Sequence, residues 1–184
     1  MELEKKSPYT ISNFLSFFRI LLVFPTVYFV SVGTNEYIYL VAFVAMLSDW
    51  LDGFLARKLN QITDLGKILD PVGDKVLIAG TVIALYYYQG FPLWLMLVIV
   101  LRDVGILIGA FFIYDKSKHV ISSNWPGKIS VNFIAITVFC FIAGWFEAFN
   151  YLLYLALFSI ILSAYIYTKV FIKNYYSRKN EFRS

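Results

Sequence analysis

The sequence predicts an all-α polytopic membrane protein: a bundle of six transmembrane helices preceded by a short interfacial helix. Hydrophobic residues make up 60% of the 184 residues and aromatic residues 20%, whereas soluble domains are about 45–50% apolar. The apolar residues form long runs, and the basic residues gather in alternate loops between these runs. Composition, run length and charge distribution therefore all indicate membrane insertion.

Each expected helix corresponds to one apolar run of about the ~20 residues that cross ~30 Å of hydrocarbon. The runs lie at about residues 14–33, 36–56, 68–88, 91–114, 129–146 and 149–172. Short gaps such as GTNEY and YYQGFP leave no room for another folded unit, so residues 1–184 are expected to form a single membrane domain. Before the first run, Tyr9 and Ile11 beside Lys5 and Lys6 predict a short amphipathic helix in the membrane interface.

The sixteen Lys and Arg residues predict the orientation. Three, including Arg19, lie near the start, and others lie between runs two and three, between runs four and five, and after run six. The positive-inside rule then puts both termini and the loop between runs two and three in the cytoplasm. We expect a multi-pass cell-membrane protein, located in a bacterial inner membrane. The net charge of +4 favours contact with anionic membrane lipids. We expect no nucleic-acid partner. Cys140 is the single cysteine, which excludes an intrachain disulfide and a thiolate metal cluster.

An acidic stretch, residues 48–75, holds five aspartates between the second and third runs. In a helix, successive residues turn by ~100°. If the second helix continues to about Lys58, one of its faces carries Asp49, Asp52, Gly53 and Ala56. The same reasoning gives the third helix a face that carries Gly66, Asp70, Gly73 and Asp74. Two carboxylates and two small residues therefore share each face.

The polar link between these helices is short, so we expect antiparallel neighbours whose four carboxylates converge. Without cations these groups would repel one another and lose hydration. All-oxygen ligands favour Mg²⁺ or Mn²⁺, and four aspartates suit two ions, a common arrangement for holding a phosphoryl group. The small residues leave space for a bulky ligand, and the guanidinium of Arg57 has the geometry to bind a phosphate.

The same residues resemble the signature of the CDP-alcohol phosphatidyltransferase family. The match has the full spacing of that signature: Asp49, Asp52-Gly53, Ala56-Arg57, eight further residues, Gly66, Asp70 and Asp74. Eight fixed residues in a 26-residue window are a specific match. Six spans with cytoplasmic termini agree with the family independently of the signature.

The resemblance implies an enzyme that transfers the phosphatidyl group of CDP-diacylglycerol to the hydroxyl of an alcohol and releases CMP. It implies two Mg²⁺ or Mn²⁺ ions held by Asp49, Asp52, Asp70 and Asp74, with Asp74 also acting as the base. The expected CDP-lipid contacts are Asn13, Gly53, Ala56, Arg57, Thr63 and Gly66. The family also suggests a homodimer.

The acceptor is expected to be a small alcohol phosphate. Arg102 lies inside the fourth run, where a charge is costly and usually functional, and with Lys128 it predicts an anion pocket. Within the family, the stretch looks closest to phosphatidylglycerophosphate synthases, which use glycerol 3-phosphate. Those enzymes commonly have a second lysine where this chain has Ser130. Because sequence neighbours on a helix point ~100° apart, a mutual pair of Arg102 with Asp103 is not expected.

Four alternatives stay open, of which a catalytically inactive lipid-binding scaffold is disfavoured by the complete signature. A eukaryotic-type cardiolipin synthase, with phosphatidylglycerol as acceptor, also has the Arg102-Asp103 pair. A further alternative is a structural salt-bridge network between the aspartates and nearby lysines. A small cation transporter also carries intramembrane carboxylates, but it predicts acids spread along the depth of the bundle. Here the acids gather at one membrane boundary.

Overall fold

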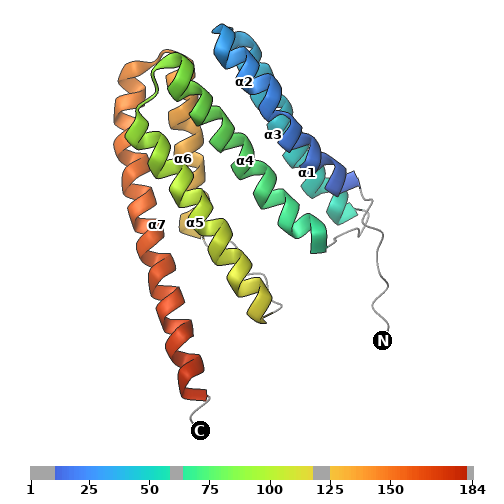
Figure 1. Cartoon of the computed structure of the whole chain (residues 1–184), viewed down its shortest axis with the longest axis vertical. Helices are drawn as coiled ribbons and strands as arrows, with labels where there is room; N and C mark the ends of the chain where they lie inside the picture. The colour runs from blue at the N-terminus through green and yellow to red at the C-terminus, as the bar shows by residue number, and fades with distance from the viewer. Residues whose placement is uncertain (1–10, 59–63, 118–124, 182–184) are drawn as a thin grey trace. The chain divides into compact units, whose positions relative to one another are not determined.

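The computed structural model describes residues 11–58, 64–117 and 125–181, and helices account for nearly all of them. Figure 1 shows their order along the chain. The helices are α1 (Ile11–Leu21), α2 (Val23–Val32), α3 (Asn35–Lys58), α4 (Asp64–Gln89), α5 (Leu93–Ser117), α6 (Trp125–Ile142) and α7 (Phe146–Glu181). None of the described residues lies in a strand, which confirms the all-α fold class.

The first apolar run forms two helices, α1 and α2, interrupted at Leu22. Pro25 has no backbone N–H, so the carbonyl of Leu21 loses its usual helical donor, which explains the interruption. The helical hydrogen bonds from Leu22 N to Phe18 O, 3.1 Å, and from Thr26 N to Leu22 O, 3.2 Å, continue across it. The two helices therefore follow one another as a single apolar segment.

Glycines in the left-handed region follow three of the described helices: Gly33 after α2, Gly90 (φ +75°) after α4 and Gly144 after α6. Gly33 has φ +74°, and the next residue, Thr34, donates its N–H to Phe29 O at 3.1 Å. Gly144 has φ +72°, and Trp145 likewise donates to Cys140 O at 2.9 Å. This is the Schellman arrangement, which satisfies the last carbonyls of a helix and turns the chain tightly.

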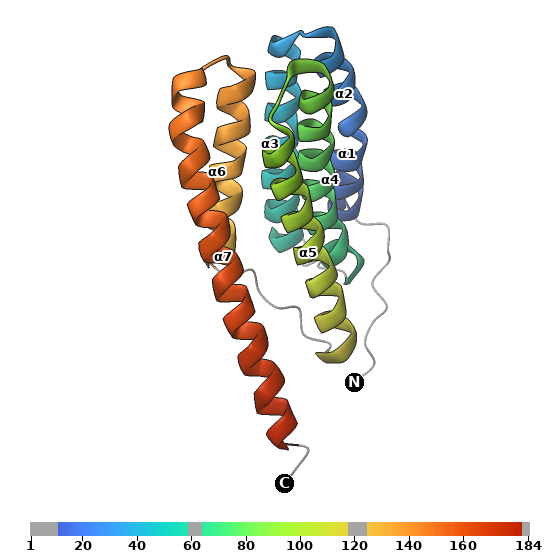
Figure 2. The same cartoon turned by 60° about the vertical axis from the view of Figure 1, so that its left-hand side comes forward.

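The chain divides into two compact units, Met1–Phe111 and Phe112–Ser184. In the first unit, the α1–α2 segment packs on both α3 and α4 (Figure 2). Two glycines of α4 bring this segment close: a Cβ on Gly73 would lie 3.0 Å from Ser16 O, and one on Gly80 would lie 2.6 Å from Val23 Cγ1. These small residues therefore allow both α1 and α2 to pack closely against α4.

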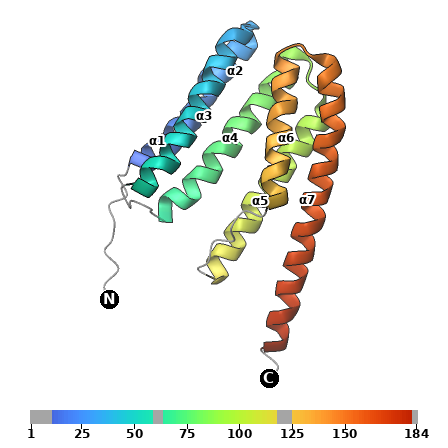
Figure 3. The same ribbon diagram turned by 180° about the vertical axis from the view of Figure 1, so that it is seen from behind.

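In the second unit, α6 and α7 run side by side (Figure 3). Ser130 Oγ donates to Ser159 O at 2.8 Å, and the Phe141 and Phe149 rings are centred 5.3 Å apart. Helix α7 extends to Glu181, beyond the expected end at residue 172. The apolar run ends there, but no Gly or Pro follows to stop the helix.

Among the described residues, two segments are long and apolar enough to cross a membrane, Asn13–Val32 and Phe146–Ile166, and Ile129–Ile142 is a shorter apolar helix. The six expected runs all fall on helices in the predicted order. Six crossings and a single domain over residues 1–184 stay predictions, and the expected interfacial helix lies mostly in residues 1–10, outside the described residues.

Candidate active site

The candidate site is assembled from three helices of the first unit. Asp49 lies in the second half of α3, and Asp70 and Asp74 lie one turn apart in the first half of α4. Among the described residues, α1 packs extensively on both α3 and α4, whereas α3 and α4 have few direct backbone neighbours in each other. The expected direct pairing of the two aspartate-bearing helices is therefore wrong in its detail. Helix α1, with its small and polar residues, joins them.

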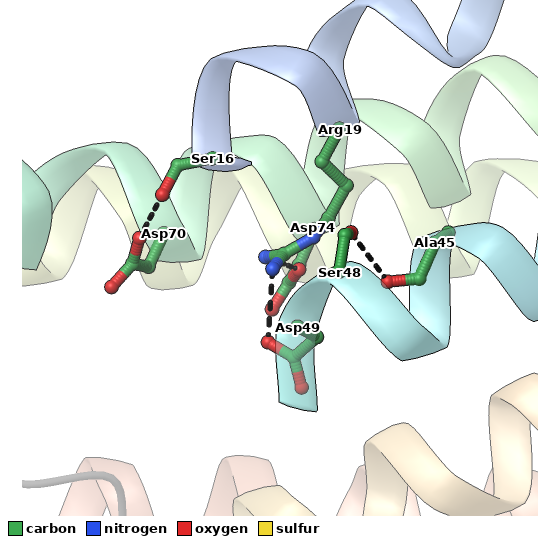
Figure 4. Close-up of polar contacts among 7 residues, drawn as sticks. All are labelled: Ser16, Arg19, Ala45, Ser48, Asp49, Asp70 and Asp74. Carbon is green, nitrogen blue, oxygen red and sulfur yellow. Dashed lines mark hydrogen bonds and ion pairs between the residues drawn. The ribbon is translucent and has the colours of Figure 1, made fainter. Parts of the chain in front are cut away.

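Arg19, in the last turn of α1, bridges the carboxylates of the other two helices. Its Nη2 lies 3.1 Å from Asp49 Oδ1, and its Nη1 donates a hydrogen bond to Asp74 Oδ1. Figure 4 shows the side chain reaching both carboxylates. Since both oxygens contact one planar guanidinium, they lie within roughly 8 Å of each other. Asp49 and Asp74, which are 25 positions apart in sequence, therefore contact the same guanidinium.

Arg19 contacts the two acids from the protein interior. Its side chain is only 2% exposed, whereas the side chains of Asp49 and Asp74 are 64% and 48% exposed. A buried charge is costly unless it is paired, so this arginine must have acidic partners. The carboxylates are held on one side and open on the other.

A second polar contact joins α1 to α4. Ser16 is fully buried and donates its hydroxyl to Asp70 Oδ1 (Figure 4). Asn13 is also buried, one turn before Ser16. Because residues three apart lie on nearly the same helix face, Asn13, Ser16 and Arg19 form one polar face of α1. That face is turned toward the aspartates.

The other residues of the acidic signature are described less fully. Asp52, Gly53, Ala56 and Arg57 follow Asp49 in the last turns of α3, where the structure describes the backbone but not these side chains. Gly66 is buried in the first turn of α4, and Thr63 lies outside the described residues. Helix geometry places Asp52 one turn beyond Asp49, on nearly the same face.

The donor chemistry fits a hard divalent cation, because the facing groups are carboxylates on α3 and α4. Arg19 already brings a positive charge between two of them. Within the described residues, no three His, Cys, Asp or Glu side chains converge as a metal-binding group. Arg19 and Ser16 instead contact one oxygen each of Asp49, Asp74 and Asp70.

Comparison with known proteins decides the family. The model of the CDP-alcohol phosphatidyltransferases matches residues 9–165. The chain belongs to this family. The match covers most of the chain and includes the acidic signature together with the polar face of α1, so the resemblance drawn from the signature is confirmed.

Curated relatives in the family carry two different names. CDP-diacylglycerol–glycerol-3-phosphate 3-phosphatidyltransferase of Mycoplasma pneumoniae is 35% identical over 162 residues, with 76% of this chain and 69% of the relative covered. The protein of the same name from Mycoplasma genitalium is 32% identical over 154 residues, with 72% and 65% covered. The chain thus spans just under two thirds of this second relative. Cardiolipin synthase (CMP-forming) of Streptomyces coelicolor is 44% identical over 69 residues, with 38% and 32% covered.

The phosphatidyltransferase fold brings a second charged group together near Asp74. Asp103 of α5 accepts from Arg102 Nη1 at 2.6 Å and from Lys75 Nζ at 3.1 Å. All three side chains are largely buried. The expectation that Arg102 and Asp103 would not pair is wrong: the long arginine side chain curls back to its neighbour, and Lys75 ties both to α4.

The second acceptor residue expected from sequence, Lys128, lies in the first turns of α6, and its side chain is not described. It belongs to the second compact unit, separate from the unit that holds Arg102. Ser130, at the place where the synthases commonly have a second lysine, is fully buried and bonded to Ser159 O. Its hydroxyl serves the packing of α6 on α7.

Sequence reasoning missed Ser16 and Arg19. Arg19 was counted with the basic residues that set the orientation, although it lies inside the first apolar run. The signal was present: three polar residues at three-residue spacing, 13, 16 and 19, on an otherwise apolar helix. A charge within such a segment usually has a partner or a function.

Proposed function

We propose that the protein transfers the phosphatidyl group of CDP-diacylglycerol to the hydroxyl of glycerol 3-phosphate, giving phosphatidylglycerophosphate and CMP. The observation that carries this proposal is the meeting of Asp49 and Asp74, from separate helices, at one guanidinium. The family assignment supports the reaction class. The names of the two Mycoplasma relatives support glycerol 3-phosphate as the acceptor.

Asp74 is the proposed base. An alcohol is a poor nucleophile at neutral pH, so a carboxylate must take its proton as the new bond forms. The acceptor oxygen attacks the phosphorus that carries the diacylglycerol, the bond from this phosphorus to the bridging oxygen breaks, and CMP leaves with that oxygen. The 48% exposure of the Asp74 side chain leaves it accessible to a bound alcohol.

Asp49, Asp52, Asp70 and Asp74 are the proposed ligands of two Mg²⁺ or Mn²⁺ ions. When bound, such ions would neutralise the diphosphate and stabilise the charge on the departing CMP. Ser16 holds one oxygen of Asp70 and thereby orients its carboxylate. We place the CDP moiety along the α3 end, against Gly53, Ala56, Arg57, Thr63 and Gly66, with Asn13 nearby.

Arg102 and Lys128 are the proposed acceptor-phosphate contacts. Arg102 shares Asp103 with Lys75, the residue next to the proposed base, so its guanidinium belongs to the same neighbourhood of the first unit. An arginine fork suits the planar recognition of a phosphate oxygen pair. The setting we propose is a homodimer in a bacterial inner membrane, with six crossings per chain and the site at the cytoplasmic boundary.

A second acceptor has its own support. The Streptomyces cardiolipin synthase is more identical to this chain than the Mycoplasma proteins are, although over a much shorter segment. Cardiolipin synthesis would use phosphatidylglycerol as the alcohol. The two proposals share the donor and the aspartates and differ only in the acceptor.

The test is CMP release by the purified full chain in mixed micelles with CDP-diacylglycerol and Mn²⁺. We expect release with glycerol 3-phosphate, and release only with phosphatidylglycerol would favour cardiolipin synthesis. Asp74→Asn is expected to abolish turnover, whereas Lys169→Gln, which removes an exposed charge of α7, should not. Absence of release with either alcohol, in protein that remains folded, would overturn the proposal and favour the transporter alternative.

A further inference from the structure

We propose that Arg19 is an internal counter-ion of the metal site, which competes with divalent ions for Asp49 and Asp74. Its guanidinium bridges the two carboxylates. When ions bind, they displace it from at least one of them. This inference rests on the metal site of the proposed function.

Arg19 contacts one oxygen of each of the two carboxylates. The two terminal nitrogens of Arg19 meet the Oδ1 atoms of Asp49 and Asp74 separately, so the single cation occupies one oxygen of each carboxylate. A divalent ion that bridges the same two carboxylates needs oxygens pointing to a common centre. Arg19 therefore takes up one oxygen of each carboxylate that would otherwise be open to an ion.

The positive charge of Arg19 would oppose an ion bound at the same carboxylates. A dication near Asp49 and Asp74 would also lie near the Arg19 guanidinium, and like charges at such separations repel strongly where water is scarce. The arginine side chain is 2% exposed, so water screens this repulsion only from the side of the exposed carboxylates. Full binding of the ion and full retention of both arginine contacts are therefore opposed.

Arg19 and the two carboxylates differ in their exposure to solvent. The two carboxylates are 64% and 48% exposed, whereas Arg19 reaches them from the interior. Ions can approach the acids from the open side without first removing α1. The arginine, by contrast, is fixed at its backbone by the close packing of α1 on α4 at Gly73. Competition through a side-chain movement is thus possible with the helices in place.

The ion pairs of Arg19 are expected to stabilise the fold when no metal ion is bound. The carboxylates of Asp49 and Asp74 would repel one another without a counter-charge, and the arginine paired with both offsets part of that repulsion. Removing the charge of Arg19 should therefore have two linked effects. It should destabilise the metal-free protein, and it should tighten the binding of divalent ions, because ions then relieve more repulsion and displace nothing.

The experiment measures Mn²⁺ affinity and thermal unfolding of the full chain in detergent, with no substrate present. Arg19→Gln is expected to bind Mn²⁺ about tenfold more tightly than the unchanged protein, within the usual range of coupling between two binding events. Its Tm should be lower in EDTA, and its rise on adding Mn²⁺ should be larger. Arg19→Lys keeps the charge but lacks the fork, so an intermediate affinity is expected.

Two matched variants separate charge from packing. Lys169→Gln removes one exposed positive charge far along the sequence and should leave Mn²⁺ affinity unchanged. Ser16→Ala removes a neutral contact to Asp70 and should not tighten metal binding. If Arg19→Gln does not fold in EDTA, the comparison of Arg19→Lys with the unchanged protein still tests the competition, because lysine keeps the positive charge but lacks the guanidinium fork that contacts both carboxylates.

The possible results test the competition, the metal site and the proposed function separately. Equal Mn²⁺ affinity in the Arg19 variants and the unchanged protein overturns the competition and leaves the metal site standing. Weaker binding in the variants also overturns it and makes Arg19 a positioning residue that preorganises the acids. If none of the proteins binds Mn²⁺, both the metal site and the competition fail. CMP release by the unchanged protein tests the proposed function separately.

Discussion

The guanidinium of Arg19 lies 3.1 Å from the carboxylate of Asp49, although the two residues belong to the first and third helices of the chain. The aspartates of the signature are therefore not arranged by their own two helices alone. Helix α1 supplies the groups that contact Asp49 on one side and Asp70 and Asp74 on the other. Substitutions in α1 should consequently affect activity as directly as those in the signature.

Ser16→Ala is expected to lower CMP release about 10- to 100-fold, as is typical when a residue that orients a metal ligand is lost. The buried hydroxyl donates to Asp70 Oδ1, and without it the carboxylate is free to rotate. The control is Ser31→Ala, which removes an exposed hydroxyl bonded to Tyr28 O at 2.7 Å on α2. Equal activity of both variants would show that Asp70 does not need this donor.

Gly73→Ala should reduce both stability and turnover. Its Cβ would lie 3.0 Å from the Ser16 carbonyl oxygen, so α1 must give way by a few tenths of an ångström, and Ser16 and Arg19 would shift with it. Overpacking of this kind costs about 1–3 kcal/mol. Thermal unfolding and CMP release would be measured together. Gly105→Ala is the matched control, because nothing lies within 4 Å of the added Cβ on α5.

A companion substitution at Gly80 separates packing from chemistry. A Cβ there would meet Val23 Cγ1 at 2.6 Å, on the α2 side of the interruption at Leu22. Gly80→Ala should therefore destabilise the protein, and adding Val23→Ala should restore much of the loss by making space. A Gly80→Ala protein as stable as the unchanged chain would argue against close packing of α2 on α4.

Much of the fold follows from the sequence because apolar run length and turn residues act locally. The helices begin and end within several residues of the expected runs in most cases, and Gly33 and Gly144 end helices as left-handed caps. The extended α7 was not expected, since hydropathy reports where a membrane segment ends and not where helical hydrogen bonding ends. The break at Leu22 follows from Pro25, a signal that run length alone does not register.

The site was predicted less completely, for a physical reason. Spacing within one helix fixes which residues share a face, so Asp70 with Asp74 could be read from the sequence. Which third helix covers those faces depends on packing between distant segments, and small residues such as Gly73 decide it. The pairing of Arg102 with Asp103 was missed because backbone angles were considered without the reach of a long side chain.

Asp103→Asn is expected to destabilise the first unit by roughly 3 kcal/mol, the lower end for breaking a buried pair from one side. Asp103 is 6% exposed in its side chain and accepts from both Lys75 and Arg102, so its neutralisation leaves two buried cations without their shared acid. Chemical denaturation would measure the change. Glu36→Gln, an exposed acid in the first turn of α3, is the control and should cost only a few tenths of a kcal/mol.

Arg102→Gln tests the proposed acceptor contact. If the guanidinium binds the acceptor phosphate, the KM for glycerol 3-phosphate should rise about 10- to 100-fold, the usual effect of losing a charged hydrogen bond. The KM for CDP-diacylglycerol should change little, because the proposed donor contacts do not include Arg102. A purely structural arginine, paired with Asp103, would instead lower the Tm and shift the kinetics of both substrates together. Measuring both KM values alongside the Tm, with Arg102→Lys as the conservative variant, therefore decides between acceptor binding and support of Asp103.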